Sequence, residues 1–316
     1  MNPERPDSST CFKGFATLLL FVALAGGAAE AQTIPPGGDL TTGSAAPVTG
    51  DILIDGRLDD AAWQRGPVLS DFVQREPFDG QAVSERTQVG IRYDDEALYV
   101  AFWAWDRDPS NIVVGETRRD TDLEKTDAVL IILDTYLDRQ NAFVFGTNPA
   151  GIEYDGQVTR EGQGGAGPNR RNQRGSGGGF NLNWDATWEV ATTQDAEGWY
   201  AEFRIPFSTL RYSRGGEQRW GLNLARRIRR NNEEAVWSPI DRQFNLWRIS
   251  QSGILEGLEA PSALTRTLTP YVLSSAVKDY QAGTDARGDL EFGGDAKLGL
   301  TSSLTLDLTV NTDFAQ

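Results

Sequence analysis

The sequence of 316 residues contains no histidine, a single cysteine and a single methionine. Histidine is the residue that most often acts as general base or metal ligand near neutral pH, so this chemistry is excluded. Met1 and Cys11 both precede the long apolar run, so the chain after that run has no thiol and forms no disulfide. Haem binding is disfavoured because lysine or tyrosine would have to bind the iron.

The first residues have the pattern of a secretory signal. Two basic residues precede the apolar run FATLLLFVALAGGAA, and the small-residue pattern AEA follows at positions 29–31. The run is too short to cross a bilayer as a stable helix. Cys11 lies before the run, so a lipoprotein-type anchor is not indicated. We therefore predict an exported protein from which residues 1–31 are removed as a signal peptide.

Acidic residues outnumber basic ones, 45 to 30, and the formal net charge is −15. A chain of this charge repels the phosphate backbone, so nucleic acid is not an expected partner.

The rest of the front portion alternates between apolar and polar residues in short segments. Residues 32–50 are rich in Pro, Gly, Ser and Thr and predict a flexible linker, with ordered structure beginning at Asp51. Period-two segments then predict β-strands. In chain order they are TQVGIRY (87–93), ALYVAFWAW (97–105), DAVLIILD (127–134), NAFVFGTN (141–148), IEYDGQV (152–158), ATWEVATT (186–193), GWYAEFRIP (198–206) and RWGLNLARRIRR (219–230). This pattern indicates an all-β protein, an antiparallel β-sandwich of jelly-roll-like form.

Two of these strands carry aromatic residues with different expected environments. In LYVAFWAW both faces are apolar, which favours an inner strand covered on both sides and makes Trp103 and Trp105 packing residues. In GWYAEFRIP one face is apolar, and we expect the other, with Glu202, to be polar. Trp63, Trp188 and Trp220 are expected to fill the core.

A glycine-rich stretch occupies residues 162–180 and includes Arg170, Arg171 and Arg174. A phosphate-binding loop would need a strand before it and a helix after it, and the sequence predicts neither. We therefore predict a mobile surface loop.

Beyond residue 263 the strands become longer and contain few bulky core residues. In SLTLDLTVNTDF, leucine and valine alternate with polar residues over nearly the ~9 to 11 residues of a membrane-spanning strand. An amphipathic strand of a soluble sheet would show the same alternation. We expect residues 263–316 to be the start of a C-terminal β-barrel-like domain, truncated at Gln316 because a barrel needs at least ~8 strands.

Several segments in fixed order resemble the carbohydrate-binding module family 9-like domain over residues 51–260. They are ILIDGRLDDAAWQ, TQVGIRYDDEALYVAFWAWDRDP, DAVLIILD, WDATWEV, GWYAEFRIPFSTLR and WGLNLARRIRRNNEEAVWSP. The pieces IPFSTLR and RRNNEE, followed by LTPYV and GLTSSLTLDLTVNTDFAQ, are similar to bacterial outer-membrane-type proteins that continue into a β-barrel domain of unknown function. The resemblance implies a β-sandwich that binds poly- or oligosaccharide. It also implies a place in the cell envelope, at the outer membrane or in the periplasm, and a link to carbohydrate catabolism through glycoside hydrolases.

Sugar recognition needs an aromatic face for stacking and polar groups for the hydroxyls. The resemblance places the Trp-Arg pair of the family's site at Trp247 and Arg248. It places the second stacking tryptophan at Glu124, and the glutamate and arginine that hold hydroxyls near Leu130 and Gly146. These last two residues cannot perform that function, so other residues would have to replace them.

The candidate replacements come from two parts of the chain. Asn245 and Trp237 accompany the Trp-Arg pair, and the loop before the Asp127 strand supplies Arg118, Arg119 and Asp122. In the alternative interpretation, Trp247 packs against a sheet edge and the charged residues are simply solvated.

Two charged groups also suggest possible ligands. Arg226, Arg227, Arg229 and Arg230 would suit an anionic glycan or a lipid headgroup, but pairing with Glu233, Glu234 and other carboxylates is the preferred interpretation. Asp106 and Asp108 are hard oxygen donors on a loop, and with Asp55, Asp120 and Asp122 they make calcium the candidate cofactor. Their spacing matches no EF-hand loop.

The sequence lacks the G-x-S-x-G motif as well as histidine, which removes the usual hydrolase nucleophiles. Two carboxylates ~5 to 9 Å apart could still serve a glycosidase, so part of a glycoside hydrolase remains an alternative by family association only. A structural or gating module of an outer-membrane β-barrel, without a sugar site, is the other alternative. The principal interpretation is carbohydrate binding by an exported envelope protein.

Overall fold

The computed structural model describes residues 40–163, 179–213 and 216–261, and three further strands between residues 266 and 310. The expected signal peptide, residues 32–39 of the expected linker, and the arginines of the glycine-rich stretch lie outside the described residues.

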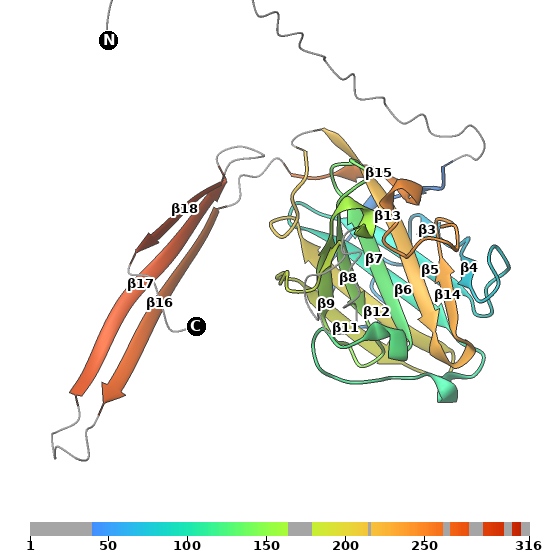
Figure 1. Cartoon of the computed structure of the whole chain (residues 1–316), viewed down its shortest axis with the longest axis horizontal. Helices are drawn as coiled ribbons and strands as arrows, with labels where there is room; N and C mark the ends of the chain where they lie inside the picture. Colours follow the sequence, from blue (N-terminus) through green and yellow to red (C-terminus); the bar gives the residue numbers. More distant parts are fainter. Residues whose placement is uncertain are drawn as a thin grey trace, which may run out of the picture. The chain divides into compact units, whose positions relative to one another are not determined.

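Two β-sheets form the front portion of the chain, and pairing in them is mainly antiparallel. Sheet A contains, in spatial order, β1 (Thr42–Ser44), β15 (Gly253–Glu259), β13 (Glu217–Ile228), β7 (Ala128–Asp134), β8 (Ala142–Thr147), β9 (Tyr154–Val158) and β10 (Phe180–Asn181), with β14 (Glu233–Val236) and β4 (Val73–Glu76) extending from β13. Sheet B contains β11 (Glu189–Gln194), β12 (Gly198–Pro206), β6 (Ala97–Trp105), β5 (Thr87–Tyr93) and β2 (Ala46–Pro47), with β3 (Val68–Leu69) also paired to β5. In Figure 1 the strands β7, β8 and β9 run side by side.

Helical structure in the described residues is limited to short 3-10 turns. These are η1 (Pro109–Asn111), η2 (Leu123–Lys125), η3 (Arg160–Gly162), η4 (Arg229–Asn231) and η5 (Ile249–Gln251). The protein is therefore all-β, as predicted. None of the described helices is long and apolar enough to cross a membrane.

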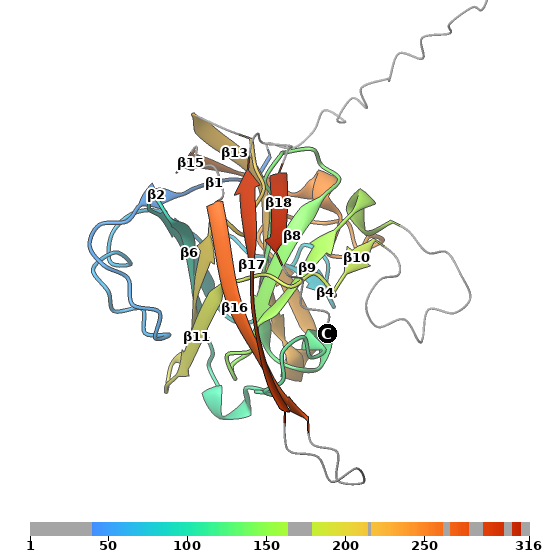
Figure 2. The same cartoon turned by 90° about the vertical axis from the view of Figure 1, so that its left-hand side faces the viewer.

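The main hydrophobic core lies between the two sheets (Figure 2). Figure 2 shows β6 and β11 on one side and β8, β9 and β10 on the other. Alternation in β6 and β12 directs Phe102 and Phe203 into this core, where their ring centroids are 5.8 Å apart. The continuous apolar run of β7 is buried on both faces, between β13 and β8, because both sides of sheet A are covered.

The outer face of each sheet is covered by an irregular segment. Residues 48–63 cover sheet B, where Trp63 packs edge-on against Trp103 with ring centroids 6.3 Å apart. Residues 237–251 contribute Ile240, Leu246 and Ile249 to the cluster on the outer face of sheet A. These two covers explain why the central strands are apolar on both faces, and they confirm β6 as an inner strand.

The predicted tryptophan fillers are buried as expected. Trp220 is fully buried, and Trp63 and Trp188 are at most 4 % exposed. Trp105 is half-buried beneath the guanidinium of Arg86, which lies 4.0 Å from its ring centroid.

The prediction of a flexible linker up to residue 50 is wrong for residues 42–47. β1 pairs in parallel with β15, and β2 pairs in parallel with β5, so ordered structure begins before Asp51. Strands two or three residues long carry too little alternation to be recognised in the sequence. They exist because the exposed backbone edges of both sheets offer them hydrogen bonds.

The prediction that one face of β12 is polar and solvent-facing is also wrong at Glu202. This residue is fully buried beneath the cover of sheet B. Its carboxylate accepts hydrogen bonds from the indole N–H of Trp63 at 2.7 Å and from the backbone N–H groups of Asp55 and Gly56 at 3.2 Å each. Burial nevertheless outweighs these donors and raises the pKa of Glu202 to about 7. A buried carboxylate therefore holds the cover on the sheet.

Residues 266–310 form a separate antiparallel sheet, sheet C, with β16 (Arg266–Val277), β17 (Arg287–Gly299) and β18 (Thr305–Val310). The long strands agree with the prediction from the alternating sequence. The register places Val272 opposite Phe292 and Leu308 opposite Ala296 on one face. The side chains of Val272, Phe292 and Leu308 are exposed. Sheet C therefore presents exposed apolar side chains on one of its faces.

The raised pKa of Glu202 predicts a pH-dependent stability. Between the ordinary pKa of 4.5 and the native value of about 7, the folded protein binds a proton that the unfolded chain has released. The free energy of unfolding should therefore fall by roughly 3 kcal/mol between pH 4.5 and pH 8 because of this group. Urea unfolding at several pH values measures it. In the variant Glu202→Gln the side chain cannot ionise, so the free energy of unfolding should fall less steeply with pH. Equal slopes in both proteins would contradict the prediction.

Candidate functional site

Trp247 lies on the outer face of sheet A within a stack of three aromatic rings. Its indole is parallel to the ring of Phe180, with centroids 4.6 Å apart and an interplanar angle of 1°. Phe180 in turn stacks on Tyr154, with centroids 6.2 Å apart and an angle of 14°. We call Tyr154, Phe180 and Trp247 the aromatic stack. It holds the indole in one orientation, because one of its two faces is already occupied by Phe180.

A glycine makes room for this stack. Alternation along β9 places Tyr154, Gly156 and Val158 on the outer face, and the ring of Phe180 lies over Gly156. A Cβ atom at Gly156 would lie 2.5 Å from Cζ of Phe180, which is closer than two carbon atoms can approach. The absence of a side chain at this position is therefore what lets Phe180 stack beside Trp247.

Polar groups surround Trp247. The guanidinium of Arg248 donates from Nη1 to Oε2 of Glu161 at 2.5 Å and lies over the ring of Phe244, 4.3 Å from its centroid. The side chain of Asn245 accepts a hydrogen bond from the backbone N–H of Trp247 at 3.1 Å. Aromatic surface and hydrogen-bonding groups therefore meet at this position.

Glu161 is a site residue that sequence reasoning missed. Its other carboxylate oxygen accepts from the backbone N–H of Ser250 at 2.9 Å, so it fixes the covering segment as well as Arg248. Glu161 has a left-handed backbone conformation, with φ of 55°, immediately before the glycine-rich stretch. No sequence pattern links it to Arg248, because the two residues are 87 positions apart and meet only in the folded chain.

A polar groove of about 270 Å³ lies on the same face of sheet A. It is lined by Arg75, Glu76, Glu124, Arg227, Arg229, Asn232, Glu233 and Glu234. Arg75 joins this groove to the covering segment, because it donates to the backbone carbonyl of Phe244 at 2.9 Å and pairs with Glu234 at 2.5 Å. Glu124, the position that the resemblance gives to a second tryptophan, is an exposed residue at the groove.

Burial raises the pKa of Tyr154, which forms one end of the aromatic stack. Arg227 and Glu124, which line the groove, also act on this phenol electrostatically. The groove therefore lies near the Tyr154 end of the stack.

The arginine run of β13 pairs mainly with protein groups, as the preferred interpretation expected. Arg227 pairs with Glu234 at 2.9 Å, and Arg230 pairs with Glu85 at 2.5 Å and with Asp106. Arg226 is fully buried and donates to the carbonyl of Trp105 at 2.8 Å. The sites expected for an anionic ligand are therefore largely occupied by the protein itself.

The candidate calcium ligands do not converge. Asp106 is bound by Arg230, and the carboxylate of Asp108 accepts from Ser110 at 2.7 Å and from Asn111 at 2.5 Å. In the described part of the chain, no group of three or more acidic or thiol side chains could hold a metal ion. The geometry therefore gives no support to calcium binding at Asp106 and Asp108.

The remaining predicted site residues lie apart from Trp247. Trp237 is 3 % exposed in the core between the sheets, so its assignment to the site is wrong. Arg119 pairs with Asp155 at 2.8 Å and with Asp185 at 2.5 Å at the beginning of β9, whereas Phe180 pairs opposite Val158 at the end of that strand. These ends are separated by roughly 10 Å of strand.

Arg118 is exposed and lies 3.7 Å from Glu116. Asp122 caps η2 through a hydrogen bond from the backbone N–H of Glu124 at 3.0 Å and pairs with Lys125 at 3.3 Å. Of the predicted set, the structure therefore brings together Asn245, Trp247 and Arg248.

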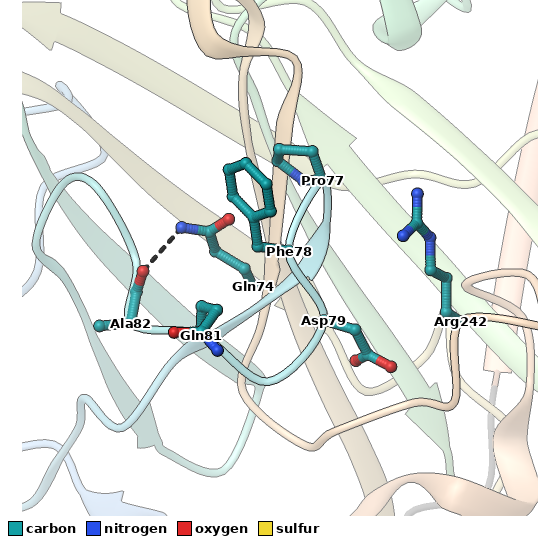
Figure 3. A pocket seen from close by; sticks show the side chains of 7 residues that line it. All are labelled: Gln74, Pro77, Phe78, Asp79, Gln81, Ala82 and Arg242. Atoms are coloured by element: carbon teal, nitrogen blue, oxygen red, sulfur yellow. Dashed lines mark hydrogen bonds between the residues drawn. The ribbon is translucent and has the colours of Figure 1, made fainter.

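A second hollow, of about 650 Å³, lies beside β4 (Figure 3). The loop after β4 supplies Pro77, Phe78 and Asp79, and Arg242 from the cover of sheet A stands across from them. The ring of Phe78 is 65 % exposed. We call this the Phe78 hollow; the sequence contained no signal for it, because its two sides come from segments about 160 residues apart.

No family model matches the chain, and no curated protein matches it either. Solved structures do match. Two are complexes of a carbohydrate-binding module family 9 from Caldicellulosiruptor kristjanssonii, one with glucose and one with cellotriose. Each is 17 % identical to this chain, with a TM-score of 0.45. The match covers 68 % of this chain for the glucose complex and 70 % for the cellotriose complex, and 95 % of the module in both. The third, from Bacteroides uniformis ATCC 8492, is described as "a putative carbohydrate-binding protein".

That third protein is 12 % identical with a TM-score of 0.50, and the match covers 69 % of this chain and 99 % of the other. The two proteins share a fold. At this identity the likeness concerns the β-sandwich alone, so the function must be argued from the site.

The packing of Phe180 over Gly156 predicts a destabilising effect of a methyl group. In Gly156→Ala the added carbon displaces the ring, and the free energy of unfolding should fall by about 1 to 3 kcal/mol. Denaturant unfolding measures the change. In the background Phe180→Ala, which leaves room for the methyl group, the same substitution should have a much smaller effect. An equal loss in both backgrounds would show that Phe180 is not the residue displaced.

Proposed function

We propose that the β-sandwich binds carbohydrate, and that Trp247, Asn245, Arg248 and Glu161 form the sugar-binding surface. The observation that carries the proposal is the position of the Arg248–Glu161 ion pair beside an indole held by the aromatic stack. An apolar ring with adjacent charged donors and acceptors suits a sugar, which presents C–H groups on its faces and hydroxyls at its rim.

Each group has a definite part in this binding. The face of Trp247 opposite Phe180 stacks against a sugar ring, and the amide of Asn245 donates to a hydroxyl. Arg248 donates and Glu161 accepts at neighbouring hydroxyls, as charge-assisted hydrogen bonds. Because Phe180 and Tyr154 fix the indole beforehand, little conformational entropy is lost when the ligand binds.

The geometry around Glu161 favours binding. Its carboxylate is held in place by Arg248 and by the backbone N–H of Ser250. Glu161 is thereby positioned to accept a hydrogen bond from a sugar hydroxyl.

Trp247→Ala tests the proposal. On a glycan array followed by calorimetry with the glycans that bind, the substitution should weaken binding at least about tenfold, because the stacking surface is lost. Trp247→Phe retains a ring and should keep part of the affinity. Trp105→Ala removes a half-buried indole from the opposite sheet and should leave binding unchanged. Equal affinity of the native protein and Trp247→Ala would refute the site.

We infer further that the protein is exported and acts in the bacterial cell envelope, with the apolar face of sheet C against the lipid of the outer membrane. Support comes from the exposure of Leu268, Val272, Phe292 and Val310, which are 60 to 76 % exposed. Such a face is unfavourable in water and suits the lipid side of a membrane-spanning sheet. The competing role, a structural or gating module without a sugar site, would share this membrane contact.

A charge on this face should weaken membrane association. An arginine on the lipid face of a strand costs about 2 to 4 kcal/mol near the middle of the bilayer. In a flotation assay with phospholipid vesicles, Val272→Arg should reduce the floating fraction strongly. Thr269→Arg, on the opposite face of the same strand, is the matched control and should float like the native protein. Flotation that is equal in both variants would contradict the proposed orientation.

A further inference from the structure

The Phe78 hollow contains the components of a sugar-binding site but is separate from Trp247. Phe78 offers an exposed ring on one side, and Arg242 offers a guanidinium on the other (Figure 3). Within the described part of the chain, neither Arg242 nor Asp79 makes an ion pair or a side-chain hydrogen bond. This distinguishes Arg242 from Arg75 and Arg227 of the polar groove, which both pair with Glu234.

Gln74 adds a further polar group to the lining of the hollow. It is 8 % exposed, and its amide nitrogen donates to the carbonyl of Ala82 at 2.7 Å (Figure 3). The amide oxygen has no hydrogen-bond partner among the described residues, although it is buried. A buried acceptor without a partner is costly, so a donor arriving from a ligand would be favourable.

The chemistry of these groups is that of a polyhydroxylated ligand. A ring for stacking, a carboxylate that accepts, a guanidinium that donates and an amide of both kinds surround a space of about 650 Å³. This volume lies within the range of sites for small organic ligands. A purely anionic ligand is disfavoured by Asp79, and a purely cationic one by Arg242.

The hollow lies close to Trp247 along the covering segment. Arg242 and Trp247 are five residues apart, so their backbones lie at most about 18 Å from each other. Between them, Phe244 is fixed by the hydrogen bond from Arg75 to its carbonyl. The segment thus presents one residue to each of two nearby sites in a fixed arrangement.

We propose that the Phe78 hollow is a second subsite for the same glycan, so that the ligand is an oligosaccharide spanning Phe78 and Trp247 and not a single sugar. This inference rests on the proposed carbohydrate binding at Trp247. One terminal sugar stacks on Trp247, and a sugar further along the chain occupies the hollow against Phe78, Asp79 and Arg242. Two linked contacts strengthen binding because the second forms at a high effective concentration.

The test uses the full chain and graded glycans. Gluco-, xylo-, manno- and N-acetylglucosamine oligosaccharides of one to six sugars are titrated by calorimetry against the native protein, Phe78→Ala, Arg242→Ala and Trp247→Ala. The native affinity should rise at least about tenfold from the monosaccharide to the longest member of the series that binds. Phe78→Ala and Arg242→Ala should lose this rise while keeping the native affinity for the monosaccharide. Trp247→Ala should lower the affinity for every member of the series.

The outcomes separate the two proposals. If the affinity does not depend on length, or if the dependence survives in both Phe78→Ala and Arg242→Ala, the second subsite is refuted and binding at Trp247 stands. If no glycan binds the native protein, the proposed function fails, and the second subsite fails with it. Phe78 is mostly exposed, so its variant should fold normally, which far-UV circular dichroism verifies.

Discussion

The two sheets are joined by one buried arginine. Arg226 starts on β13 of sheet A and crosses to sheet B, where it donates to the carbonyls of Arg86 and Trp105 at 2.8 Å each and to the hydroxyl of Thr87 at 3.0 Å. Burial lowers its pKa to about 10, so it remains charged at neutral pH, and the nearby carboxylates of Asp106 and Asp127 favour that charge. A buried cation with these partners fixes the position of one sheet on the other, because losing a partner would leave its charge less compensated in the core.

With the sandwich fixed, each outer face is closed by an irregular segment held by a buried carboxylate. Glu202 binds the cover of sheet B, and Glu234 binds Arg75, which in turn holds the cover of sheet A at Phe244. The two covers differ in what they expose. The one aromatic residue in the cover of sheet B, Trp63, is buried, whereas the cover of sheet A presents the half-buried Trp247 and the exposed Arg242. The sugar-binding surface that we propose is therefore built on a rigid sheet by a segment without regular structure.

Two tryptophans ten residues apart show how far sequence reasoning could go. Trp237 and Trp247 each follow an aliphatic residue and precede a polar one, so this local pattern does not distinguish them. In the structure Trp237 is buried against Gly43 and Gly253, and Trp247 stacks on Phe180 over Gly156. The difference arises from strand neighbours that are distant in the chain. Glu161 illustrates the same limit, because its pairing with Arg248 exists only after β9 and the covering segment have come together.

The sequence by itself determined the longer strands and which of their residues share a face, because a period of two residues is a local property of the chain. It determined that β6 and β7 lie inside and that the chain carries no histidine or thiol chemistry after its first residues. Only the tertiary structure decided which arginines are buried, which carboxylate holds a cover, and that Trp247, Arg248 and Glu161 share one surface. These outcomes depend on contacts between residues far apart in the chain. A local sequence pattern cannot predict the free energy of such contacts.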